Sequence, residues 1–324
     1  MAHQVEIGNE SGTAGKPPTV APSNGTYASP RQFEIQSAPY PFVALSRRSG
    51  MDTEKHRFGS LLSGKVAVIY GAGGAIGGAV ARAFHDEGAR LFLAGRTRSR
   101  LDEVAATLRP SGPAVELAVV DTLDPSAVEA HAEGVAARAG RIDVVMNAVG
   151  LVHVQGKSFS EQTLDEFAWP IEGYARVHFT IAKAASRYML PHQSGVILAL
   201  STPGSRLPGP GFMGYGVACA ALEAMTRHLA GELGPQGIRA ICLKPDAIPD
   251  ALERSHSRAI FEPIAAQHGL TPEAMLAEHA QRNALLRRLP TLSQVAAAAA
   301  FYASDRAAGT TGAIVNLTCG SQLD

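Results

Sequence analysis

A glycine-rich stretch that starts at residue 71 has the composition and setting of a phosphate-binding loop. The apolar stretch Val66–Tyr70 is typical of a strand, and it runs directly into GAGGAIGG at residues 71–78, which an alanine-rich helical pattern follows. Glycines at such a turn let the backbone approach a pyrophosphate, and the N–H groups at a helix N-terminus favour its negative charge. This context predicts dinucleotide binding. The expected contacts are Gly71, Gly73, Gly74, Ile76 and Gly77.

Two arginines follow the next predicted strand. Arg96 and Arg98 stand at the spacing where dinucleotide-binding folds distinguish a ribose hydroxyl from a 2′-phosphate. An acidic residue would favour NAD(H) there, whereas a guanidinium suits a phosphate. The sequence therefore favours NADP(H), bound by Arg96, and leaves NAD(H) possible. The plainer alternative is that both arginines are solvated residues at the start of a helix.

The composition argues against several other kinds of protein. The 324 residues include 29 Lys+Arg and 29 Asp+Glu, so no long-range field attracts nucleic acid. The longest nearly apolar stretch, Val295–Ala303, is about half as long as a membrane-spanning helix. The cysteines Cys219, Cys242 and Cys319 are odd in number and lack metal-ligand spacing. We expect a cytoplasmic protein without a metal site, a nucleic-acid partner or a membrane anchor.

Short β-branched stretches alternate with alanine-rich helical patterns from Lys65 onward. This alternation is typical of repeated βα units and a parallel sheet, whose ligands bind at the carboxyl ends of the strands. We expect an α/β fold, a Rossmann-type doubly wound parallel sheet of seven strands, in a single domain at residues 59–324. The expected strands are Val66–Tyr70, Arg90–Ala94, Val115–Val120, Val144–Asn147, Gly195–Leu200, Arg239–Leu243 and Ala313–Leu317.

Residues 1–58 differ from the rest of the chain. They are rich in Pro, Gly, Ser and Thr and show neither helical nor strand periodicity, which predicts a disordered N-terminal extension. Met51 opens a stretch that looks like a natural protein start, so we expect the preceding 50 residues to be a translation-start artefact or an inert tail. The alternative is an arm that wraps a neighbouring subunit.

Residues 60–324 resemble the short-chain dehydrogenase/reductase family, whose landmarks occur in order. The glycine loop is similar to the family's Thr-Gly-x-x-x-Gly-x-Gly motif, with Tyr70 in place of Thr and Ala75 in place of the middle Gly. The stretch NAVG that begins at Asn147 is similar to the family's Asn-Asn-Ala-Gly. The resemblance implies a nicotinamide dinucleotide, with Asp121 at the adenine and with Asn147 and Pro245 also at the cofactor site.

The resemblance also assigns the catalytic positions, and the sequence departs from the family there. The proton-exchanging tyrosine corresponds to Tyr215, but Cys219 replaces the lysine that lowers the tyrosine pKa and holds the nicotinamide ribose. Residues four apart share one helix face, so a mostly neutral thiol would lie beside the tyrosine. Thr202 takes the place of the substrate-binding serine and follows Ser201. The catalytic candidates are Tyr215, Thr202, Ser201 and Cys219.

Two further positions depart from the family pattern. Tyr174 stands near the place of a helical asparagine, and Asp246 follows Pro245 where the family has glycine. Asp246 would either contact the carboxamide side of the cofactor or cap the next turn, and the sequence does not choose between these roles.

Other polar side chains lie at the expected functional edge. His153 and Lys157 follow the fourth strand, and His178 lies one helical turn after Tyr174, so each offers replacement acid–base chemistry. Arg206 offers a site for an anionic substrate. The plainer interpretations are a solvated loop, a packed histidine and a surface arginine.

The stretch between Pro249 and Pro290 contains two helical patterns, Ala251–His268 and Pro272–Arg288, which the resemblance identifies as a substrate lid. Its arginines would receive an acidic or phosphorylated substrate, or would simply oppose the dipole at a helix C-terminus. These arginines are Arg282, Arg287 and Arg288.

Together with the resemblance, these residues predict an NADP(H)-dependent oxidoreductase that transfers hydride between the nicotinamide and a carbonyl or alcohol of ketone or 3-oxoacyl type. Cys219 motivates the alternative of a dinucleotide-binding sensor or inactive subunit without redox turnover. Another alternative is epimerase or dehydratase chemistry with His153 as the acid or base. The resemblance also implies a homodimer or homotetramer that pairs through helices at Trp169–Leu190 and Met213–Leu233.

Overall fold

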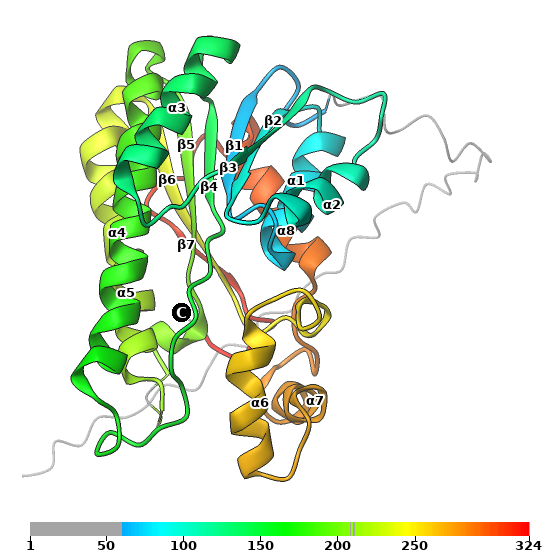
Figure 1. Ribbon diagram of the computed structural model, residues 1–324, viewed down its shortest axis with the longest axis vertical. Helices are drawn as coiled ribbons and strands as arrows, with labels where there is room; N and C mark the ends of the chain where they lie inside the picture. Colours follow the sequence, from blue (N-terminus) through cyan, green and yellow to red (C-terminus); the bar gives the residue numbers. More distant parts are fainter. Residues whose placement is uncertain (1–59, 208, 210, 324) are drawn as a thin grey trace, which may run out of the picture. The chain divides into compact units, whose positions relative to one another are not determined.

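The computed structural model describes residues 60–207, 209 and 211–323, and a seven-stranded sheet runs through them (Figure 1). Every strand pair is parallel, in the order β3-β2-β1-β4-β5-β6-β7. The expected doubly wound α/β fold is therefore confirmed. The strands are β1 (Val66–Tyr70), β2 (Arg90–Gly95), β3 (Val115–Val119), β4 (Val144–Asn147), β5 (Gly195–Leu200), β6 (Ile238–Pro245) and β7 (Ile314–Leu317).

Helices cover both faces of the sheet. In Figure 1, α3, α4 and α5 lie on one face and α1, α2 and α8 on the other, while α6 and α7 lie beyond the carboxyl ends of the strands. The helices are α1 (Ala75–Asp86), α2 (Arg98–Ala106), α3 (Pro125–Ala139), α4 (Leu164–Met189), α5 (Met213–Leu233), α6 (Ser257–Gln267), α7 (Pro272–Asn283) and α8 (Leu292–Ala303). Short 3₁₀ segments lie at Leu190–His192, Pro203–Ser205, Gly234–Gln236, Pro249–Ala251 and Asp305–Ala307.

The central strands read as continuous apolar stretches because both faces of the sheet are covered. All residues of β1 and β4 are buried, and the side chains on the two faces belong to two separate hydrophobic clusters. The strand order reverses at β1, whose neighbours are β2 and β4. Ligands bind at the carboxyl edge beside such a switch point, so the fold itself marks the loops after β1 and β4.

The two helices beyond the sheet are shorter than the sequence pattern predicts. Helix α6 begins at Ser257 rather than Ala251, because the preceding residues form a 3₁₀ segment and turns. Helix α7 ends at Asn283 rather than Arg288, and Arg287 has a φ of 53°, a left-handed conformation that cannot continue a helix. The predicted N-terminal extension, residues 1–58, lies outside the described residues.

Helices α4 and α5 approach each other closely at the functional edge. A Cβ on Gly214, in the first turn of α5, would lie 2.6 Å from the backbone oxygen of Phe167 in α4. Thr163 and Glu166 form a capping box that fixes the start of α4. These contacts set the position of Tyr215, the next residue of α5.

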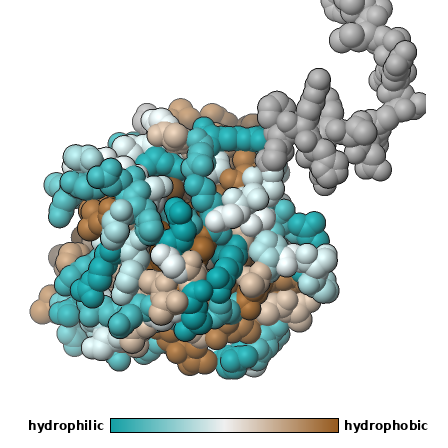
Figure 2. Space-filling view, turned by 90° about the horizontal axis from the view of Figure 1, so that it is seen from above, coloured by the Kyte–Doolittle hydropathy of each residue, from teal (hydrophilic) through white to brown (hydrophobic). Residues whose placement is uncertain are grey.

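The surface of the described residues is mixed in polarity. Figure 2 shows that hydrophilic side chains cover most of the face seen from above, with smaller hydrophobic areas between them. Within the described part of the chain, no helix has both the length and the apolar character needed to cross a membrane.

Candidate active site

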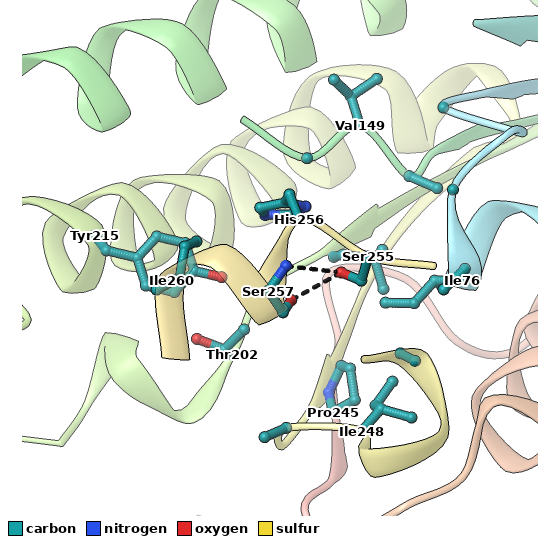
Figure 3. Close-up of a pocket in the computed structure, with 18 of the residues that line it drawn as sticks. Ile76, Val149, Thr202, Tyr215, Pro245, Ile248, Ser255, His256, Ser257 and Ile260 are labelled. Carbon is teal, nitrogen blue, oxygen red and sulfur yellow. Dashed lines mark hydrogen bonds between the residues drawn. The ribbon is translucent and has the colours of Figure 1, made fainter. Parts of the chain in front are cut away.

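A cavity of about 510 Å³ lies at the carboxyl edge of the sheet and extends from the loop after β1 to the lid helices α6 and α7. Figure 3 shows residues of the glycine loop, α5 and the lid around it, among them Ile76, Tyr215 and Ile260. The loops after β2, β4, β5 and β6 also contribute to its walls. The residues predicted to bind a cofactor and those predicted to do chemistry therefore lie mostly around one space.

The loop after β1 has a backbone that only glycine can form. Gly71 has a φ of +78°, and a Cβ there would lie 2.5 Å from the backbone oxygen of Ala148. A Cβ on Gly77 would lie 2.3 Å from the oxygen of Gly71, so Gly77 serves the packing of α1 against the loop and does not line the cavity. Gly73, Gly74 and Ile76 do line the cavity.

The first turn of α1 also suits an anion. Its N-cap residue, Gly74, offers no side chain to the free backbone N–H groups of this turn. Those groups and the helix dipole favour a phosphate beside the loop. The residues present therefore fit the pyrophosphate of a dinucleotide.

The end of β2 supplies positive charge to the same cavity. Arg96, Thr97 and Arg100 line it, whereas the guanidinium of Arg98 binds Asp102 at 2.9 Å. Arg100 was not anticipated from the sequence, although it lies three residues after Thr97, one helical turn away. Among the described residues that line the cavity, none at this end is acidic.

The remaining cofactor candidates are divided between the cavity and its surroundings. Asn147 and Pro245 line the cavity, and the Asn147 side-chain oxygen accepts a hydrogen bond from the Val149 N–H at 3.2 Å. Asp121 is exposed and accepts a hydrogen bond from the Leu123 N–H at 3.0 Å. Val120 and Thr122, its neighbours in the chain, line the cavity instead.

Tyr215, Thr202 and Cys219 meet at the opposite end of the cavity. The Tyr215 hydroxyl lies close enough to the Thr202 hydroxyl and the Cys219 thiol for both to affect its pKa, and the Thr202 Oγ1 lies 3.4 Å from the Cys219 Sγ. Thr202 follows β5, and its Oγ1 also accepts the Gly204 N–H at 3.3 Å. The three side chains predicted from separate parts of the sequence are thus in mutual contact.

Among the described residues, no cation offsets the effect of burial on the pKa values of Tyr215 and Cys219. Burial raises the pKa of Tyr215 well above its ordinary value, and the neighbouring thiol and Tyr174 raise it further. Burial also raises the pKa of the Cys219 thiol, against the effect of its Thr202 hydrogen bond. Both groups therefore carry their protons at neutral pH, which suits Tyr215 as a proton donor and leaves Cys219 a weak nucleophile.

Ser201 is committed to a neighbouring carboxylate. Its Oγ donates to the Glu223 Oε1 at 3.0 Å, and the Ser205 Oγ donates to the same oxygen at 2.6 Å. Glu223 is buried one helical turn after Cys219 on α5. This arrangement holds the loop after β5 against α5 and so fixes Thr202 next to Tyr215.

His153 lies flat against the tyrosine ring. The ring centroids of His153 and Tyr215 are 4.2 Å apart with an interplanar angle of 17°. His153 Nδ1 lies 2.7 Å from the Leu151 carbonyl oxygen, so this nitrogen donates, and Nε2 then accepts from the Gln155 amide at 2.7 Å. Burial lowers the pKa of His153 to about 4. A neutral imidazole with both nitrogens engaged stabilises the position of the Tyr215 ring.

Tyr174 supports the same loop. Its hydroxyl accepts the Leu151 N–H at 3.0 Å, and its ring lies edge-on to His153 with centroids 6.1 Å apart. His178, one turn further along α4, is buried and its Nδ1 lies 3.4 Å from the Asn147 amide nitrogen. His178 does not line the cavity.

The charged side chains considered for substrate binding point elsewhere. Lys157 forms an ion pair with Glu166 at 2.5 Å, and Arg206 is exposed. The lid arginines bind groups near α7: Arg282 pairs with Glu278, Arg287 donates to the Gln281 carbonyl oxygen, and Arg288 donates to Gln294. None of these five basic residues lines the cavity.

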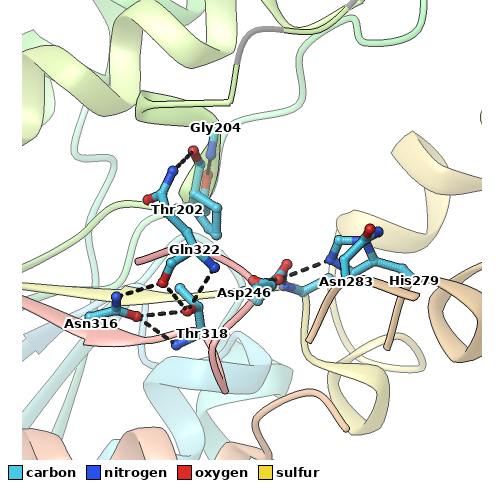
Figure 4. Close-up of polar contacts among 11 residues, drawn as sticks. Thr202, Gly204, Asp246, His279, Asn283, Asn316, Thr318 and Gln322 are labelled. Carbon is cyan, nitrogen blue, oxygen red and sulfur yellow. Dashed lines mark hydrogen bonds and ion pairs between the residues drawn. The ribbon is translucent and has the colours of Figure 1, made fainter. Parts of the chain in front are cut away.

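Asp246 joins the loop after β6 to the lid. Its carboxylate accepts hydrogen bonds from the Ala247 N–H, the Ser321 hydroxyl and His279 on α7 (Figure 4). Burial opposes ionisation of Asp246, but these hydrogen bonds outweigh it and hold its pKa below the usual value. The pKa of His279 is correspondingly raised. Asp246 thus anchors α7.

The lid side of the cavity is largely apolar, although Arg254, Ser255, His256, Ser257 and His279 also line it. Its aliphatic and aromatic side chains come from the loop after β5 and from both lid helices. Within the described residues, no group of His, Cys, Asp and Glu side chains has the arrangement of a metal site. The apolar lining residues are Leu207, Phe212, Ile260, Phe261, Ile264, Met275 and Leu276.

Comparisons with known proteins agree with this geometry. Residues 71–322 match the family model described as enoyl-(acyl carrier protein) reductase. The chain is 33% identical over 255 residues to the uncharacterized oxidoreductase MT0954 of Mycobacterium tuberculosis (strain CDC 1551 / Oshkosh), covering 78% of this chain and 89% of that protein. It is 33% identical over 248 residues to momilactone A synthase of Oryza sativa subsp. japonica, covering 75% and 85% respectively.

A solved structure shows the same fold. The crystal structure of levodione reductase superposes with a TM-score of 0.72 at 27% sequence identity, covering 80% of this chain and 98% of that one. The family match spans the glycine loop, the cluster of Tyr215 with Thr202, and the lid. On these grounds the protein is a member of the short-chain dehydrogenase/reductase family of oxidoreductases.

Proposed function

We propose that the protein is an NADP(H)-preferring oxidoreductase that interconverts a bulky, uncharged ketone and its secondary alcohol. One observation carries this proposal: a single cavity has the glycine loop and two arginines at one end and the Tyr215 hydroxyl at the other. A nicotinamide dinucleotide bound along it would supply or accept the hydride. The chain's own residues would hold the substrate and manage the proton.

Tyr215 and Thr202 are the groups for the reacting oxygen. A protonated Tyr215 donates its hydroxyl hydrogen to a carbonyl oxygen as that oxygen gains charge, and Thr202 offers a second hydrogen bond beside it. Because burial keeps the pKa of Tyr215 high, the geometry favours reduction, in which the tyrosine acts as an acid. Oxidation of an alcohol requires the tyrosine to lose its proton and should need more alkaline conditions.

The preference for NADP(H) rests on the end of β2. Arg96 and Arg100 line the cavity there, and two guanidinium groups suit a 2′-phosphate better than a ribose hydroxyl. NAD(H) remains the alternative cofactor. The discriminating observation is the ratio of the two dissociation constants.

The substrate class follows from the lid side of the cavity. Phe212, Phe261 and Met275 belong to a lining that offers mainly apolar contact. Arg282 and Arg288 do not line the cavity, and Arg254, which does, is paired with Glu103. This supports an uncharged ring or chain ketone over a phosphorylated or carboxylated substrate. A 3-oxoacyl chain without its carrier would also match this lining.

The first test is a fluorescence titration with NADPH and NADH, followed by turnover of the tighter cofactor with matched carbonyl compounds. The panel pairs neutral cyclic ketones with analogues that carry a carboxylate or a phosphate. We expect NADPH to bind more tightly and only the neutral ketones to be reduced. Tight binding without oxidation of NADPH by any compound would refute the proposal.

A second function, dinucleotide binding without turnover, is favoured by the buried thiol of Cys219. Burial of Tyr215 and Cys219 without a nearby cation leaves the tyrosine without the group that lowers its pKa in the family. If this function is correct, Cys219→Lys should create reductase activity where the natural protein has none. Activity in the natural protein would exclude it. Epimerase or dehydratase chemistry through His153 is less favoured, because both of its ring nitrogens already have partners.

We further propose that the chain is a cytoplasmic homodimer or homotetramer. Exposed apolar side chains on α4 and α5, including Phe179 and Val217, offer a surface for a second copy. Light scattering of the full chain should give a multiple of the 33.8 kDa mass. Phe179→Glu should shift the protein toward the monomer, whereas an unchanged mass would place the interface elsewhere.

A further inference from the structure

His256 is a lid residue that projects into the middle of the cavity. It precedes α6, and its ring lies so close to Gly150 that a Cβ on that glycine would be 2.2 Å from the His256 Cε1. In Figure 3 it lies between Tyr215 and Ile76, beneath the turn that carries Val149. Its ring centroid is 6.4 Å from that of His153, which in turn stacks on Tyr215.

The turn that carries Val149, against which His256 lies, is part of the cofactor end as well. The backbone of Ala148 and Val149 approaches Gly71 so closely that a Cβ there would lie 2.5 Å from the Ala148 oxygen. A row of neighbouring groups therefore leads from the glycine loop through Gly150, His256 and His153 to Tyr215. A dinucleotide whose pyrophosphate lies at the loop and whose reacting ring lies at Tyr215 must pass this imidazole.

The other imidazoles around the cavity are already engaged. His153 uses both nitrogens, on Leu151 and Gln155, and His279 uses both, on Asp246 and Asn283. Within the described residues, neither ring nitrogen of His256 has a hydrogen-bond partner, yet the residue is only partly exposed. It is the imidazole at this site with nitrogens available to a ligand.

The backbone around His256 is fixed on both sides. The Ser257 N–H donates to the Ser255 Oγ at 3.1 Å, and the two serine hydroxyls lie 2.8 Å apart (Figure 3). Arg254 forms an ion pair with Glu103 on α2. The ring is thus held over Gly150 from a braced turn rather than from a free loop.

We propose that His256 binds the nicotinamide nucleoside of the cofactor and replaces, from the lid, the ribose-holding contact that the missing lysine would make from α5. A neutral imidazole offers one donor and one acceptor, which suits a pair of ribose hydroxyls. Burial lowers the pKa of His256 below its ordinary value, so the neutral form prevails near pH 7. The inference rests on the proposed dinucleotide binding but not on turnover.

The test compares NADP⁺ with adenosine 2′,5′-bisphosphate, which lacks the nicotinamide nucleoside, by isothermal titration calorimetry on the full chain. Loss of this contact in His256→Ala should weaken the affinity for NADP⁺ about 3- to 10-fold. The affinity for the bisphosphate should stay within about twofold of that of the natural protein. His256→Asn, which keeps a donor and an acceptor, should recover part of the loss. His268→Ala, at the exposed far end of α6, is the matched control and should change neither ligand.

Each other result overturns the inference. Unchanged NADP⁺ affinity in His256→Ala means that the ring does not touch the cofactor, and an equal loss for both ligands means that the substitution disturbs the lid as a whole. Tighter NADP⁺ binding means that His256 blocks the site. If the natural protein binds neither ligand, NAD⁺ and ADP replace them as probes, and failure of all four refutes dinucleotide binding itself.

As a second measurement, the His256 Cε1–H resonance should shift when NADP⁺ binds and stay in place with the bisphosphate. The resonance is assigned by its loss in His256→Asn. A shift of equal size with both ligands would contradict direct contact with the nicotinamide nucleoside.

Discussion

The two ends of the cavity are built in different ways. At the glycine loop the backbone makes the site: Gly71, Gly73 and Gly74 bring main chain close to the cavity, and arginines such as Arg96 and Arg100 add charged side chains. The opposite end of the cavity, called the reacting end below, consists of side chains, with Tyr215 next to Thr202, Cys219 and His153.

This difference has a physical cause. Where a Cβ would lie 2.5 Å or less from a backbone oxygen, as at Gly71 and Gly77, no other residue fits without moving the main chain. A side-chain cluster has more solutions, since a proton donor can be oriented by a stacked ring or by a hydroxyl. The reacting end can therefore change its chemistry while the fold and the cofactor end stay the same.

The largest expected effect is at the reacting end. Tyr215→Phe should reduce turnover about 10²- to 10⁴-fold, because it removes the proposed proton donor and keeps the ring that stacks on His153. Affinity for NADPH should stay within about twofold, since the hydroxyl lies beside the Thr202 and Cys219 side chains and one neutral hydrogen bond contributes little. Single-turnover kinetics with a neutral ketone measures the first quantity, and fluorescence titration measures the second.

Tyr302→Phe on α8 is the control for this variant, because Tyr302 does not line the cavity. Turnover by Tyr215→Phe equal to that of the control would remove Tyr215 from the chemistry. The comparison between the two ends would then fail, since the reacting end would have no proton donor of its own.

At the glycine loop, Gly71→Ala should cost at least about 2 kcal/mol of unfolding free energy and abolish cofactor binding, because strain and a steric clash add together. Gly64→Ala is the matched control: its φ is +75°, but nothing lies within 4 Å of the added Cβ. The control should lose only the conformational cost, about 1 kcal/mol. Equal losses in urea unfolding would show that the contact with Ala148 does not matter.

The sequence predicted the glycine-loop end of the cavity well. The strand before Gly71, the loop and the helix after it are local features, so one stretch of chain contains all the information. The seven strands were predicted within a few residues of their observed bounds, because strands buried on both faces are apolar throughout. Arg100 was missed because its role depends on the direction of α2, which a single residue type does not specify.

The reacting end could be predicted only in part. The positions of Tyr215, Thr202 and Cys219 followed from the family resemblance, but their neighbours come from distant segments. The stacking of His153 on Tyr215, the engagement of Ser201 by Glu223, and the place of His256 over Gly150 are tertiary contacts. The spacing of residues in the sequence does not predict these contacts, because the loops and the lid that bring the side chains together have no regular pattern of apolar and polar residues.

A smaller effect separates the two arginines after β2. Arg96→Ala should weaken the affinity for NADPH about 10-fold or more, since a hydrogen bond to a charged group contributes about 1.5–3 kcal/mol. The affinity for NADH should stay nearly unchanged. Arg98→Ala is the matched control, because Arg98 is occupied by Asp102 and does not line the cavity. Dissociation constants for both cofactors, measured by fluorescence at one salt concentration, decide the outcome. A loss for Arg98→Ala as large as for Arg96→Ala would point to general electrostatics rather than to a phosphate site.

The smallest expected effect is a pH dependence of the lid, which the glycine end should not share. The pKa of His279 is raised, chiefly by its hydrogen bond with Asp246, so its contribution to stability is complete below the ordinary histidine pKa and is lost as the pH rises through the raised value. The pKa of Asp246 is lowered despite its burial, so its contribution is present above the ordinary aspartate pKa and is lost as the pH falls. The ion pair therefore stabilises the lid most between about pH 4 and pH 6.5.

His279→Gln keeps a donor for Asp246 but removes the charge, so it isolates this ion pair. At pH 5.5 the variant should lose about 0.5–1 kcal/mol of unfolding free energy, and at pH 8.5 the difference should nearly vanish, because the His279 side chain is partly exposed and the pair is screened. His268→Gln, which lies exposed after α6, should show no such dependence. Urea unfolding of both variants at the two pH values makes the comparison. An equal loss at pH 5.5 and pH 8.5 would mean that His279 acts through its packing or its neutral hydrogen bond, and the lid would then be as insensitive to pH as the glycine loop.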